Sequence, residues 1–260
     1  MPEVDKGDCG RPAWLAVALP RSPYMEIWRL QAALAAARRE GTIDRDVVLF
    51  LEHLPVFTLG RRGGRENLKV PESFLDESKI PIVHVERGGS ITYHGPGQIV
   101  VYPIIDLKNS PFSVIEYVTC LEEVMIRTLA AWGIPAERNR LNRGVWVNDC
   151  KIGSLGVAIR RGVSFHGFSL NVSVSMEPFK WMHPCGLKDV GVTSMSCELA
   201  QDVPVAGVLE TMKKQMSDVF HVNLIPAGID GLLRKMEIGD QRPEVGCRKS
   251  EEQEVEKLRR

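Results

Sequence analysis

Two residues that can act as a nucleophile and as a base stand in unusual surroundings. Cys185 lies between a proline and a glycine in "HPCGLKDVGVTS", a segment without helical or strand periodicity. Lys151 begins "KIGSLGVAI", whose other residues are apolar or small. A thiolate can take up an acyl group, and a partly desolvated lysine can exchange protons near neutral pH. The plain alternatives are a buried, inert cysteine and a lysine whose ammonium reaches the solvent.

A glycine-rich segment offers a possible ligand site. "RGGSITYHGPGQ", residues 87–98, places four glycines around otherwise strand-forming residues. They could serve tight turns, or their missing Cβ atoms could let a ligand lie against the backbone between Arg87 and His94. The segment contains neither the GK[ST] of a P-loop nor GxGxxG, so it does not predict a nucleotide phosphate site. Another histidine, His166 in "FHGF", is equally well explained as a core residue.

Composition narrows the class of protein. The chain has 260 residues, 44% hydrophobic and 25% charged, and its 33 basic and 33 acidic residues give no net charge. No global field therefore favours nucleic acid or a membrane surface. The longest apolar runs, such as "VVLFL", are far below the ~20 residues of a membrane span. The sequence shows no signal peptide, and its six cysteines form no CxxC pair. We therefore expect reduced thiols, a cytoplasmic location and no metal site.

The elements that must position these residues follow from periodicity. Apolar spacings of three and four predict a helix over 113–132, and helices are also expected over 24–41 and 206–219. We expect strands over 14–19, 46–53, 56–60, 80–86, 99–106 and 221–225, and three closely spaced strands between 144 and 174. The pattern favours one α+β domain with a mixed sheet over 13–238. Residues 1–12 are expected to be a loose leader, and residues 239–260 a charged, disordered tail.

Several segments together resemble the octanoyltransferases of lipoate biosynthesis. They are "RGGSITYHGPGQIVVYPI", "GVWVNDCKIGSLGVAIRRGVSFHGFSLNV" and "PCGLKDVGVTS", with "LPVFTLGRRG" as a further match. The resemblance covers about residues 14–224. It implies a single α+β domain with a mixed central sheet flanked by helices, like that of the biotin and lipoate protein ligases and related to the class II synthetase core. It also implies an acyl transfer that uses no cofactor, ATP or metal.

The resemblance assigns roles to residues of this chain. Cys185 would take octanoate from the phosphopantetheine thioester of acyl carrier protein, and Lys151 would assist. A lysine on a lipoyl domain of a 2-oxoacid dehydrogenase E2 subunit, or on the glycine cleavage H protein, would then accept the acyl group. The implied acyl-chain contacts are Arg87, Gly88, Gly89, Ser90, Ile91, Thr92, Tyr93, His94, Ser154, Leu155, Gly156, Gly167, Phe168 and Ser169.

Further expectations concern the pocket, the partner surface and the rival functions. Medium-chain specificity needs apolar walls, for which Tyr93, Leu155 and Phe168 are candidates. The acidic donor protein needs a basic surface, which either Arg61, Arg62 and Arg65 or Arg138, Arg140 and Arg143 could supply.

An ATP-dependent lipoate–protein ligase has a similar lysine segment but needs no nucleophilic cysteine. A non-catalytic lipoyl- or acyl-carrier-binding protein would need neither the cysteine nor the lysine.

Overall fold

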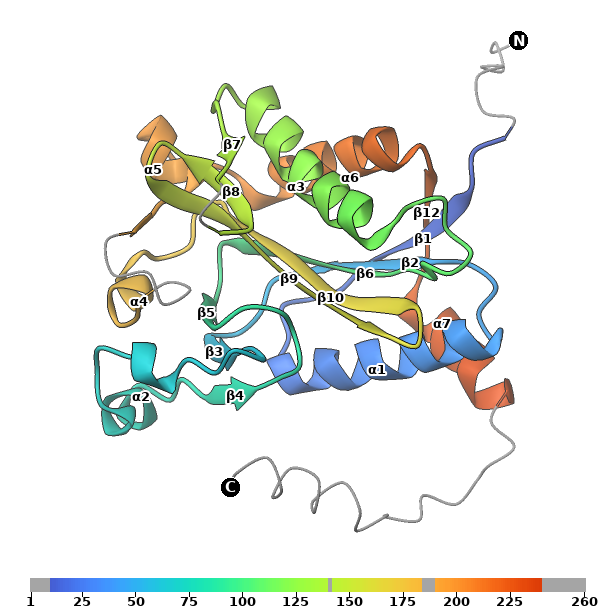
Figure 1. Cartoon of the computed structure of the whole chain (residues 1–260), viewed down its shortest axis with the longest axis horizontal. Helices are drawn as coiled ribbons and strands as arrows, with labels where there is room; N and C mark the ends of the chain where they lie inside the picture. Colours follow the sequence, from blue (N-terminus) through green and yellow to red (C-terminus); the bar gives the residue numbers. More distant parts are fainter. Residues whose placement is uncertain (1–9, 140–141, 184–189, 240–260) are drawn as a thin grey trace.

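A long mixed β-sheet forms the centre of the molecule (Figure 1). The computed structural model describes residues 10–139, 142–183 and 190–239. The strands of the large sheet are β1 (Ala13–Ala18), β2 (Val47–Leu51), β6 (Gln98–Ile104), β7 (Glu137–Arg138), β8 (Gly144–Val147), β9 (Cys150–Arg160), β10 (Val163–Asn171), β11 (Gly191–Val192) and β12 (Asn223–Pro226). Their order is β12-β1-β2-β6-β10-β9-β8-β7, and β11 pairs with β9. β12, β1 and β2 are parallel, whereas the neighbours from β2 to β7 are antiparallel.

Tight turns connect the antiparallel strands that carry the lysine segment. β8 and β9 are joined through Asn148, whose φ of 51° is left-handed. β9 and β10 are joined by Arg161 and Gly162, with φ values of 51° and 92°, as a two-residue hairpin of this kind requires. From the second of these turns, β9 and β10 stay in register over eight residue pairs.

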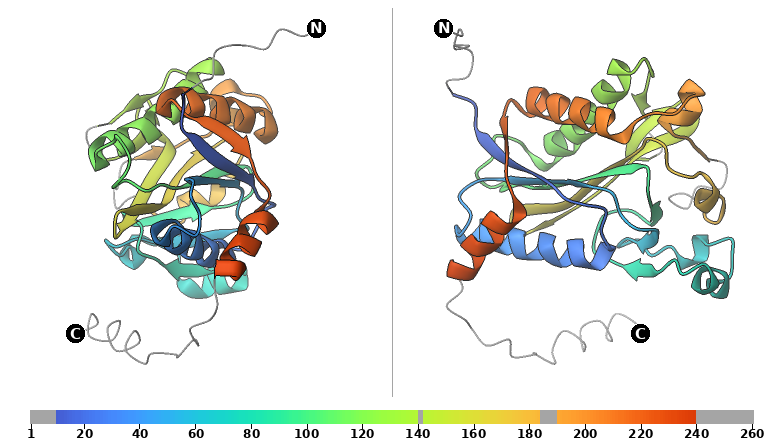
Figure 2. Two further views of the ribbon diagram at one scale, coloured as in Figure 1. Left: turned by 90° about the vertical axis from the view of Figure 1, so that its right-hand side faces the viewer. Right: turned by 180° about the vertical axis from the view of Figure 1, so that it is seen from behind.

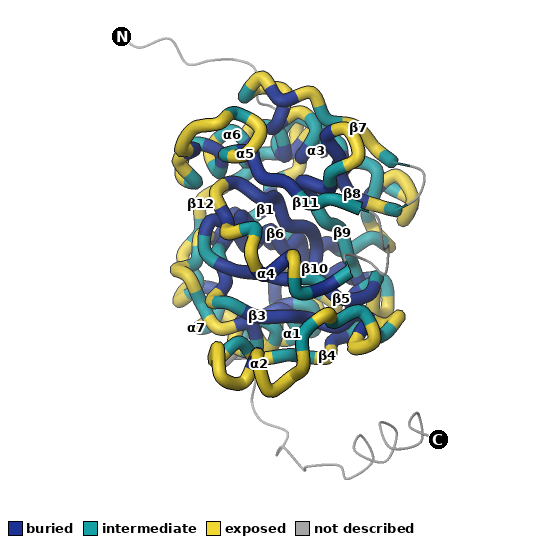
Figure 3. Tube along the Cα trace, turned by 90° about the vertical axis from the view of Figure 1, so that its left-hand side faces the viewer, coloured by how far each residue is buried: buried dark blue, intermediate teal, exposed yellow. Residues whose placement is uncertain are grey.

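Helices cover both faces of the sheet (Figures 1 and 2). They are α1 (Tyr24–Glu40), α2 (Glu72–Glu77), α3 (Val114–Ala131), α4 (Glu177–Lys180), α5 (Met195–Leu199), α6 (Val205–Phe220) and α7 (Ile229–Gly239), with a 3-10 turn, η1 (Arg65–Asn67). α3 and α6 pack with alternate strand residues such as Phe50 into one apolar cluster. α1 and α7 pack with the intervening residues, such as Leu49, into another. Buried strands thus lie between helical layers, with the exposed residues on the outer loops (Figure 3).

A second, three-stranded sheet lies beside α1. It consists of β3 (Val56–Leu59), β4 (Ile82–His84) and β5 (Ile91–His94), in the order β4-β3-β5, and packs on α2 and α4. The sequence indicated only turn residues over 87–98, because the flanking glycines leave too few strand-forming residues to predict the short strand 91–94. Figure 1 shows the 87–91 connection crossing towards β9 and β10, which places the glycine-rich segment against the large sheet. The backbone N–H of Gly88 donates to the carbonyl of Val157 at 3.1 Å.

The fold class is confirmed as a single α+β unit with a mixed central sheet flanked by helices. The predicted helices begin and end within about one residue of α1, α3 and α6. Ser113 explains the sharp start of α3: its hydroxyl accepts from Glu116 N–H while the Glu116 carboxylate accepts from Ser113 N–H. Residues 1–9 of the expected leader and the tail from 240 lie outside the described residues. No helix within the described ranges has the length and apolar character that crossing a bilayer requires.

Candidate active site

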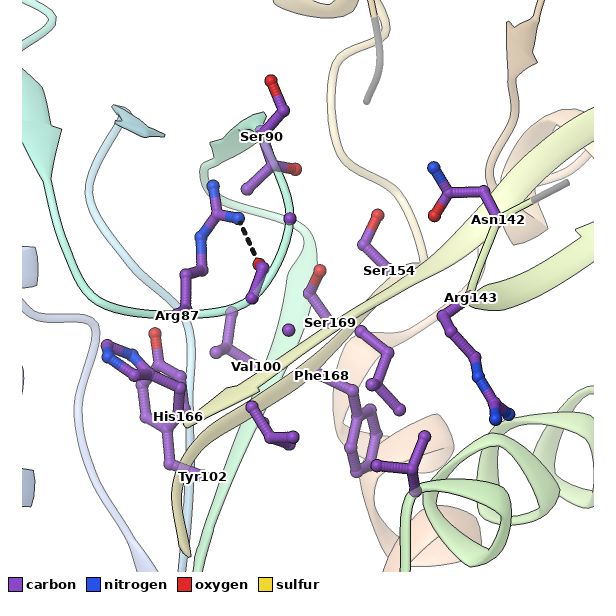
Figure 4. Close-up of a pocket in the computed structure, with 18 of the residues that line it drawn as sticks. Arg87, Ser90, Val100, Tyr102, Asn142, Arg143, Ser154, His166, Phe168 and Ser169 are labelled. Carbon is purple, nitrogen blue, oxygen red and sulfur yellow. Dashed lines mark hydrogen bonds between the residues drawn. The ribbon is translucent and has the colours of Figure 1, made fainter. Parts of the chain in front are cut away.

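A cavity of about 330 Å³ lies between the glycine-rich connection and strands β9 and β10 (Figure 4). This volume is at the lower end of the range for small-molecule sites. Of the predicted site residues, the following line it: Arg87, Gly88, Gly89, Ser90, Ile91, Thr92, His94, Lys151, Ser154, Leu155, Gly156, Gly167, Phe168 and Ser169. Residues from three separate sequence segments therefore meet at one cavity.

The cavity has a buried end and an open end. Tyr24, Tyr102 and His166 line the buried end and are at most 4% exposed. At the open end, Val114 and Ile115 at the start of α3 are 49% and 70% exposed. Figure 4 shows Tyr102 and His166 at one end, Arg143 and Asn142 at the other, and Ser154, Phe168 and Ser169 between them. A chain that enters from solvent therefore passes apolar side chains before it meets a polar floor.

Lys151 is held by the segment that precedes β8. Its ammonium donates to the carbonyl of Arg143 at 2.9 Å and to Asn142 Oδ1 at 3.3 Å. The same nitrogen lies 5.4 Å from the centre of the Trp146 ring, within the range of a cation–π contact. Only 4% of Lys151 is exposed although it lines the cavity. The alternative of a lysine that extends into bulk solvent is therefore wrong.

Arg87 forms a rigid cationic wall. Its guanidinium donates to Thr58 Oγ1 at 3.0 and 2.8 Å, to the Thr58 carbonyl at 2.6 Å and to the Gly88 carbonyl at 3.0 Å. The last of these is the dashed line in Figure 4. Because several donors are fixed to β3 and to its own loop, Arg87 stabilises the glycine-rich connection as well as lining the cavity.

The glycines serve contacts within the protein more than contacts with a ligand. A Cβ on Gly156 would lie 2.7 Å from the Gly88 carbonyl oxygen, and one on Gly167 would collide with the Val101 carbonyl oxygen. Bare backbone is thus required because the loop packs on β9 and because β10 packs closely on β6. Both glycines also line the cavity, so their contact with an acyl chain stays a prediction.

Tyr93 does not line this cavity, contrary to the sequence-based expectation. Side chains alternate along β5, so the Tyr93 ring points away from the side on which His94 lies. It packs instead against Phe57 and Phe179, with ring centroids 5.2 and 5.4 Å away. Leu155 and Phe168, the other two expected walls, do line the cavity.

His166 reaches the buried end because its backbone is left-handed. Its φ is 55°, which is unusual inside a strand and changes the face on which the side chain lies. The ring Nδ1 lies 3.4 Å from the Tyr24 hydroxyl, and Nε2 lies 3.7 Å from the Glu86 carboxylate, beyond hydrogen-bond distance. The Gln31 side chain accepts from the His166 backbone N–H at 2.8 Å. Polar atoms and a strained backbone thus meet at the floor of the cavity.

Three buried histidines surround this floor. Burial lowers the pKa of His53 to about 4, and it likewise lowers the pKa of His94 and of His166. His53 Nδ1 lies 3.0 Å from the Ser22 carbonyl, which can only accept, so Nε2 accepts from the Tyr102 hydroxyl at 2.8 Å. These rings are therefore neutral near pH 7. Sequence reasoning missed His53, Tyr24 and Tyr102, because nothing in their local patterns separates them from ordinary core residues.

The cysteine segment is described only at its flanks, and Cys185 itself lies outside the described residues. Before it, the backbone N–H of His183 donates to the Asn67 carbonyl at 2.8 Å. After it, Val192 on β11 pairs in register with Lys151, and Thr193 N–H donates to the Lys151 carbonyl at 3.0 Å. A small gap adjoining the cavity is lined by Lys151 and Thr92 on one side and by Met182 and Val192 on the other.

Two other cysteines are poor nucleophiles. Burial raises the pKa of Cys120 and of Cys150, so both thiols are protonated near pH 7. Cys150 directly precedes Lys151, and its sulfur is close to Gly191 of β11. Neither thiol lines the cavity beside Lys151.

Comparison with known proteins identifies the family. The family profile described as "Lipoyl protein ligase A/B catalytic domain" matches residues 23–217. An octanoyltransferase of Desulfotalea psychrophila is 46% identical over 206 residues, covering 78% of this chain and 92% of that protein. One of Xylella fastidiosa is 40% identical, covering 82% and 90%. A lipoate protein ligase structure from T. acidophilum with bound lipoic acid has a TM-score of 0.68 at 17% identity, covering 86% and 94%, and so shares the fold. The chain therefore belongs to the octanoyltransferases of the lipoyl protein ligase A/B catalytic-domain family.

Proposed function

We propose that this protein moves an octanoyl group from acyl carrier protein to a lysine of lipoyl domains, through a thioester on Cys185. The identity to octanoyltransferases over most of the chain supports the overall reaction. The cavity supports it too, because apolar walls can bury an acyl chain at ~0.8 kcal/mol per CH₂. An ATP-dependent ligase of the same fold is the alternative that the experiment below must distinguish.

The first half-reaction is an exchange between two thioesters. The Cys185 thiolate attacks the donor carbonyl, a new C–S bond forms, and the phosphopantetheine thiolate leaves and takes up the proton that Cys185 gave up. Because a thioester replaces a thioester, the step needs a thiolate rather than ATP. An ordinary cysteine, with a pKa of ~8.5, is only slightly ionised at pH 7. A nearby ammonium favours the thiolate, and we assign this task to Lys151.

The second half-reaction converts the thioester into an amide. The amine of the acceptor lysine attacks the Cys185 thioester, the C–N bond forms, and the Cys185 thiolate leaves. The proton released by the amine passes to Lys151, which needs to be in its neutral form at that moment. The Arg143 carbonyl and Asn142 Oδ1 accept from the Lys151 nitrogen and so hold it at the edge of the cavity, which supports this assignment.

The single observation that carries this proposal is the pairing of β11 with β9. The chain that leaves the cysteine segment pairs directly with Lys151 through Val192, and Thr193 repeats the contact. The chain that enters the segment is fixed at Met182 and His183, and Met182 shares a small gap with Lys151. Both flanks are thus attached near the lysine, which favours a role for Cys185 at the cavity.

The proposed partners are two proteins that use the same opening in turn. Acyl carrier protein is the donor, and lipoyl domains of 2-oxoacid dehydrogenase E2 subunits and the glycine cleavage H protein are the acceptors. We propose a cytoplasmic location, since the reduced cysteine that the mechanism needs persists there. Cys120, Cys150 and Cys197 are free thiols in the structure.

Mass spectrometry of the acylated protein tests the proposal. Octanoyl-acyl carrier protein alone should give an octanoyl adduct on Cys185, and adding a lipoyl domain should discharge it. Cys185→Ser should abolish transfer, whereas Cys150→Ser, which changes the cysteine beside Lys151, should not. Lys151→Ala should slow adduct formation at neutral pH and recover partly at high pH, where the thiol ionises unaided. Transfer that survives Cys185→Ser at full rate, or that needs ATP and free acid, would contradict the mechanism.

A further inference from the structure

Glu122 is a buried acid in an otherwise apolar part of α3. Its side chain is 1% exposed, and its helix neighbours Leu121, Val124 and Met125 belong to the main apolar cluster. A carboxylate at such a place is costly unless it is paired and hydrogen-bonded. Neither acyl transfer nor the family resemblance discussed above gives it a task.

Within residues 10–139, 142–183 and 190–239, the polar contacts of Glu122 lead to the strands beside Lys151. One oxygen, Oε1, accepts from the backbone N–H of Gly144 at 2.9 Å. The other, Oε2, lies 3.1 Å from Arg143 Nη1 and 3.4 Å from Arg138 Nε. The carboxylate therefore fixes the backbone and one side chain at the point where β8 begins.

The same short segment holds the lysine. The Arg143 carbonyl accepts from Lys151 Nζ at 2.9 Å, and this carbonyl belongs to the peptide whose N–H, that of Gly144, binds Glu122. A Cβ on Gly144 would lie 2.7 Å from Lys151 Cε, so the lysine side chain runs directly over this backbone. One peptide group thus links the carboxylate and the ammonium.

The ladder between β8 and β9 is irregular beside Lys151. The register between β8 and β9 shifts between Val145 and Trp146: Val145 pairs with Gly153, whereas Trp146 pairs with Lys151. Ile152 is therefore the extra residue of a bulge, and such bulges turn a neighbouring side chain in a new direction. Gly144 pairs with Ser154 of β9, whereas Arg143 precedes β8, so the Glu122 carboxylate adds a contact from outside the sheet to the Arg143–Gly144 peptide.

We propose that Glu122 is a positioning residue, which sets the place of the Lys151 ammonium in the cavity through the Arg143–Gly144 peptide. The inference rests on the proposed function in that it gives Lys151 a catalytic task. The position of the lysine is a separate matter from that task. It can therefore be measured independently of acyl transfer.

Two Glu122 variants and one matched control test the proposal. Glu122→Gln keeps an oxygen for Gly144 N–H but presents an amide to the two arginines, and Glu122→Ala removes every contact. Glu123→Gln is the control, because Glu123 is the next residue of α3 and also pairs with Arg138, whereas the carboxylate that accepts from Gly144 N–H is that of Glu122. The two readouts are octanoyl transfer and the rate at which acetic anhydride labels Lys151, followed by mass spectrometry from pH 7 to 10.

The expected results differ between the variants. Glu122→Ala should lower kcat on the order of 10²-fold, the effect of a small misplacement of a reacting group, with little change in KM for the acyl donor. Glu122→Gln should give a smaller loss, and Glu123→Gln none. Labelling of Lys151 should become faster in both Glu122 variants, because a displaced lysine leaves its buried position, and should be unchanged in Glu123→Gln. If Glu122→Ala does not fold, Arg143→Ala, which removes a half-exposed partner, should change both readouts in the same direction.

Failure of the inference and failure of the proposed function give different results. Labelling and kcat that are unchanged in folded Glu122→Gln and Arg143→Ala, with Lys151→Ala inactive, would overturn the positioning role. Full activity of Lys151→Ala would instead overturn the proposed role of the lysine in transfer. In that case the labelling rates would still decide whether Glu122 positions Lys151.

Discussion

Lys151 and Arg87 are buried cations that the protein treats in different ways. Arg87 donates to three oxygens and two chain segments, a fixed arrangement that suits a structural wall. Lys151 donates to a carbonyl and an amide oxygen of the segment that precedes β8, next to a bulge. An arginine side chain keeps its proton in proteins and so cannot act as a base, whereas the neutral amine of a lysine can. The residue types therefore match the roles that the geometry allows.

His166 is expected to limit the length of the acyl chain. Its ring lines the buried end of the cavity, beside Val157 on the paired strand β9. At 3.4 Å per residue, Val157 lies about 10 Å along β9 from Ser154, which also lines the cavity. His166→Gly keeps the left-handed backbone and removes the ring, so two more CH₂ groups should fit. At ~0.8 kcal/mol each, the ratio of decanoyl to octanoyl transfer should rise by about tenfold.

Competition between the two acyl donors, read by mass spectrometry, measures this ratio. His166→Ala should show the same change with lower stability, because a left-handed backbone costs roughly 1–2 kcal/mol in a residue with a Cβ. Tyr93→Phe is the control, since that ring packs on Phe57 away from the cavity. An unchanged ratio in His166→Gly would show that another residue ends the chain.

At the scale of elements, the sequence predicts helices and strands with a repeating apolar pattern and misses short strands. α3 was predicted because Leu121, Met125 and Leu129 recur on one face, and β9 and β10 because turn residues separate them. β5 was missed, since glycines flank four residues that pair only with β3. The sequence predicts which segments line the cavity but not which side chains face it. Tyr93 faces away because of where β5 begins, and the sequence does not show where this short strand begins. The left-handed backbone of His166 likewise has no local sequence signal.

The connection between β3 and η1 is expected to attract the acidic donor protein. Arg61 and Arg62 are exposed there, Arg62 lines the cavity, and no ion pair is found for either within residues 10–139, 142–183 and 190–239. Arg65 instead pairs with Glu72, and the other predicted patch is partly neutralised because Arg138 and Arg143 pair with Glu122. The two candidate patches therefore differ in free charge, although Arg62 of one and Arg143 of the other both line the cavity.

Arg61→Ser should raise KM for octanoyl-acyl carrier protein by about tenfold at low salt, because a rim charge acts mainly on association. The effect should fade as salt is added. Arg65→Ser, from the same connection, should change KM little. A small octanoyl thioester without the carrier protein should react equally with both variants. Loss of activity with that small donor would mean that Arg61 acts on the chemistry rather than on docking.

At the scale of the whole molecule, the cavity lies where two sheets and α1 meet. β6 and β10 supply one wall, the β4–β5 connection another, and the start of α1 closes the end with Tyr24. The histidines gather at this junction, where His53 comes from the segment after β2 and His94 from the end of β5. Ring centroids of His53 and His94 are 5.8 Å apart. Folding therefore brings together several groups that must stay uncharged.

This junction predicts a loss of stability in mild acid. The pKa of His53 is about 4 in the fold and ~6.5 in the unfolded chain, so between these values only the unfolded chain is protonated at this site. Stability should therefore be complete above about pH 6.5 and fall as the pH decreases, by about 1.4 kcal/mol per unit and about 3 kcal/mol in all for His53. His94 and His166, whose pKa values are also lowered by burial, should steepen the fall.

Urea denaturation between pH 7.5 and 4.5 measures this slope. His53→Asn keeps a donor for the Ser22 carbonyl but cannot bind the proton. The slope of the free energy of unfolding against pH should therefore decrease by up to about 1.4 kcal/mol per pH unit, the slope of one proton. His84→Asn, at an exposed position on β4, should leave the slope unchanged. Ordinary carboxyl groups have pKa values of ~4, so the loss between pH 6.5 and 5 is assigned to the histidines. If His53→Asn and the unaltered protein lose stability equally over that range, the neutral-histidine junction does not control the acid sensitivity.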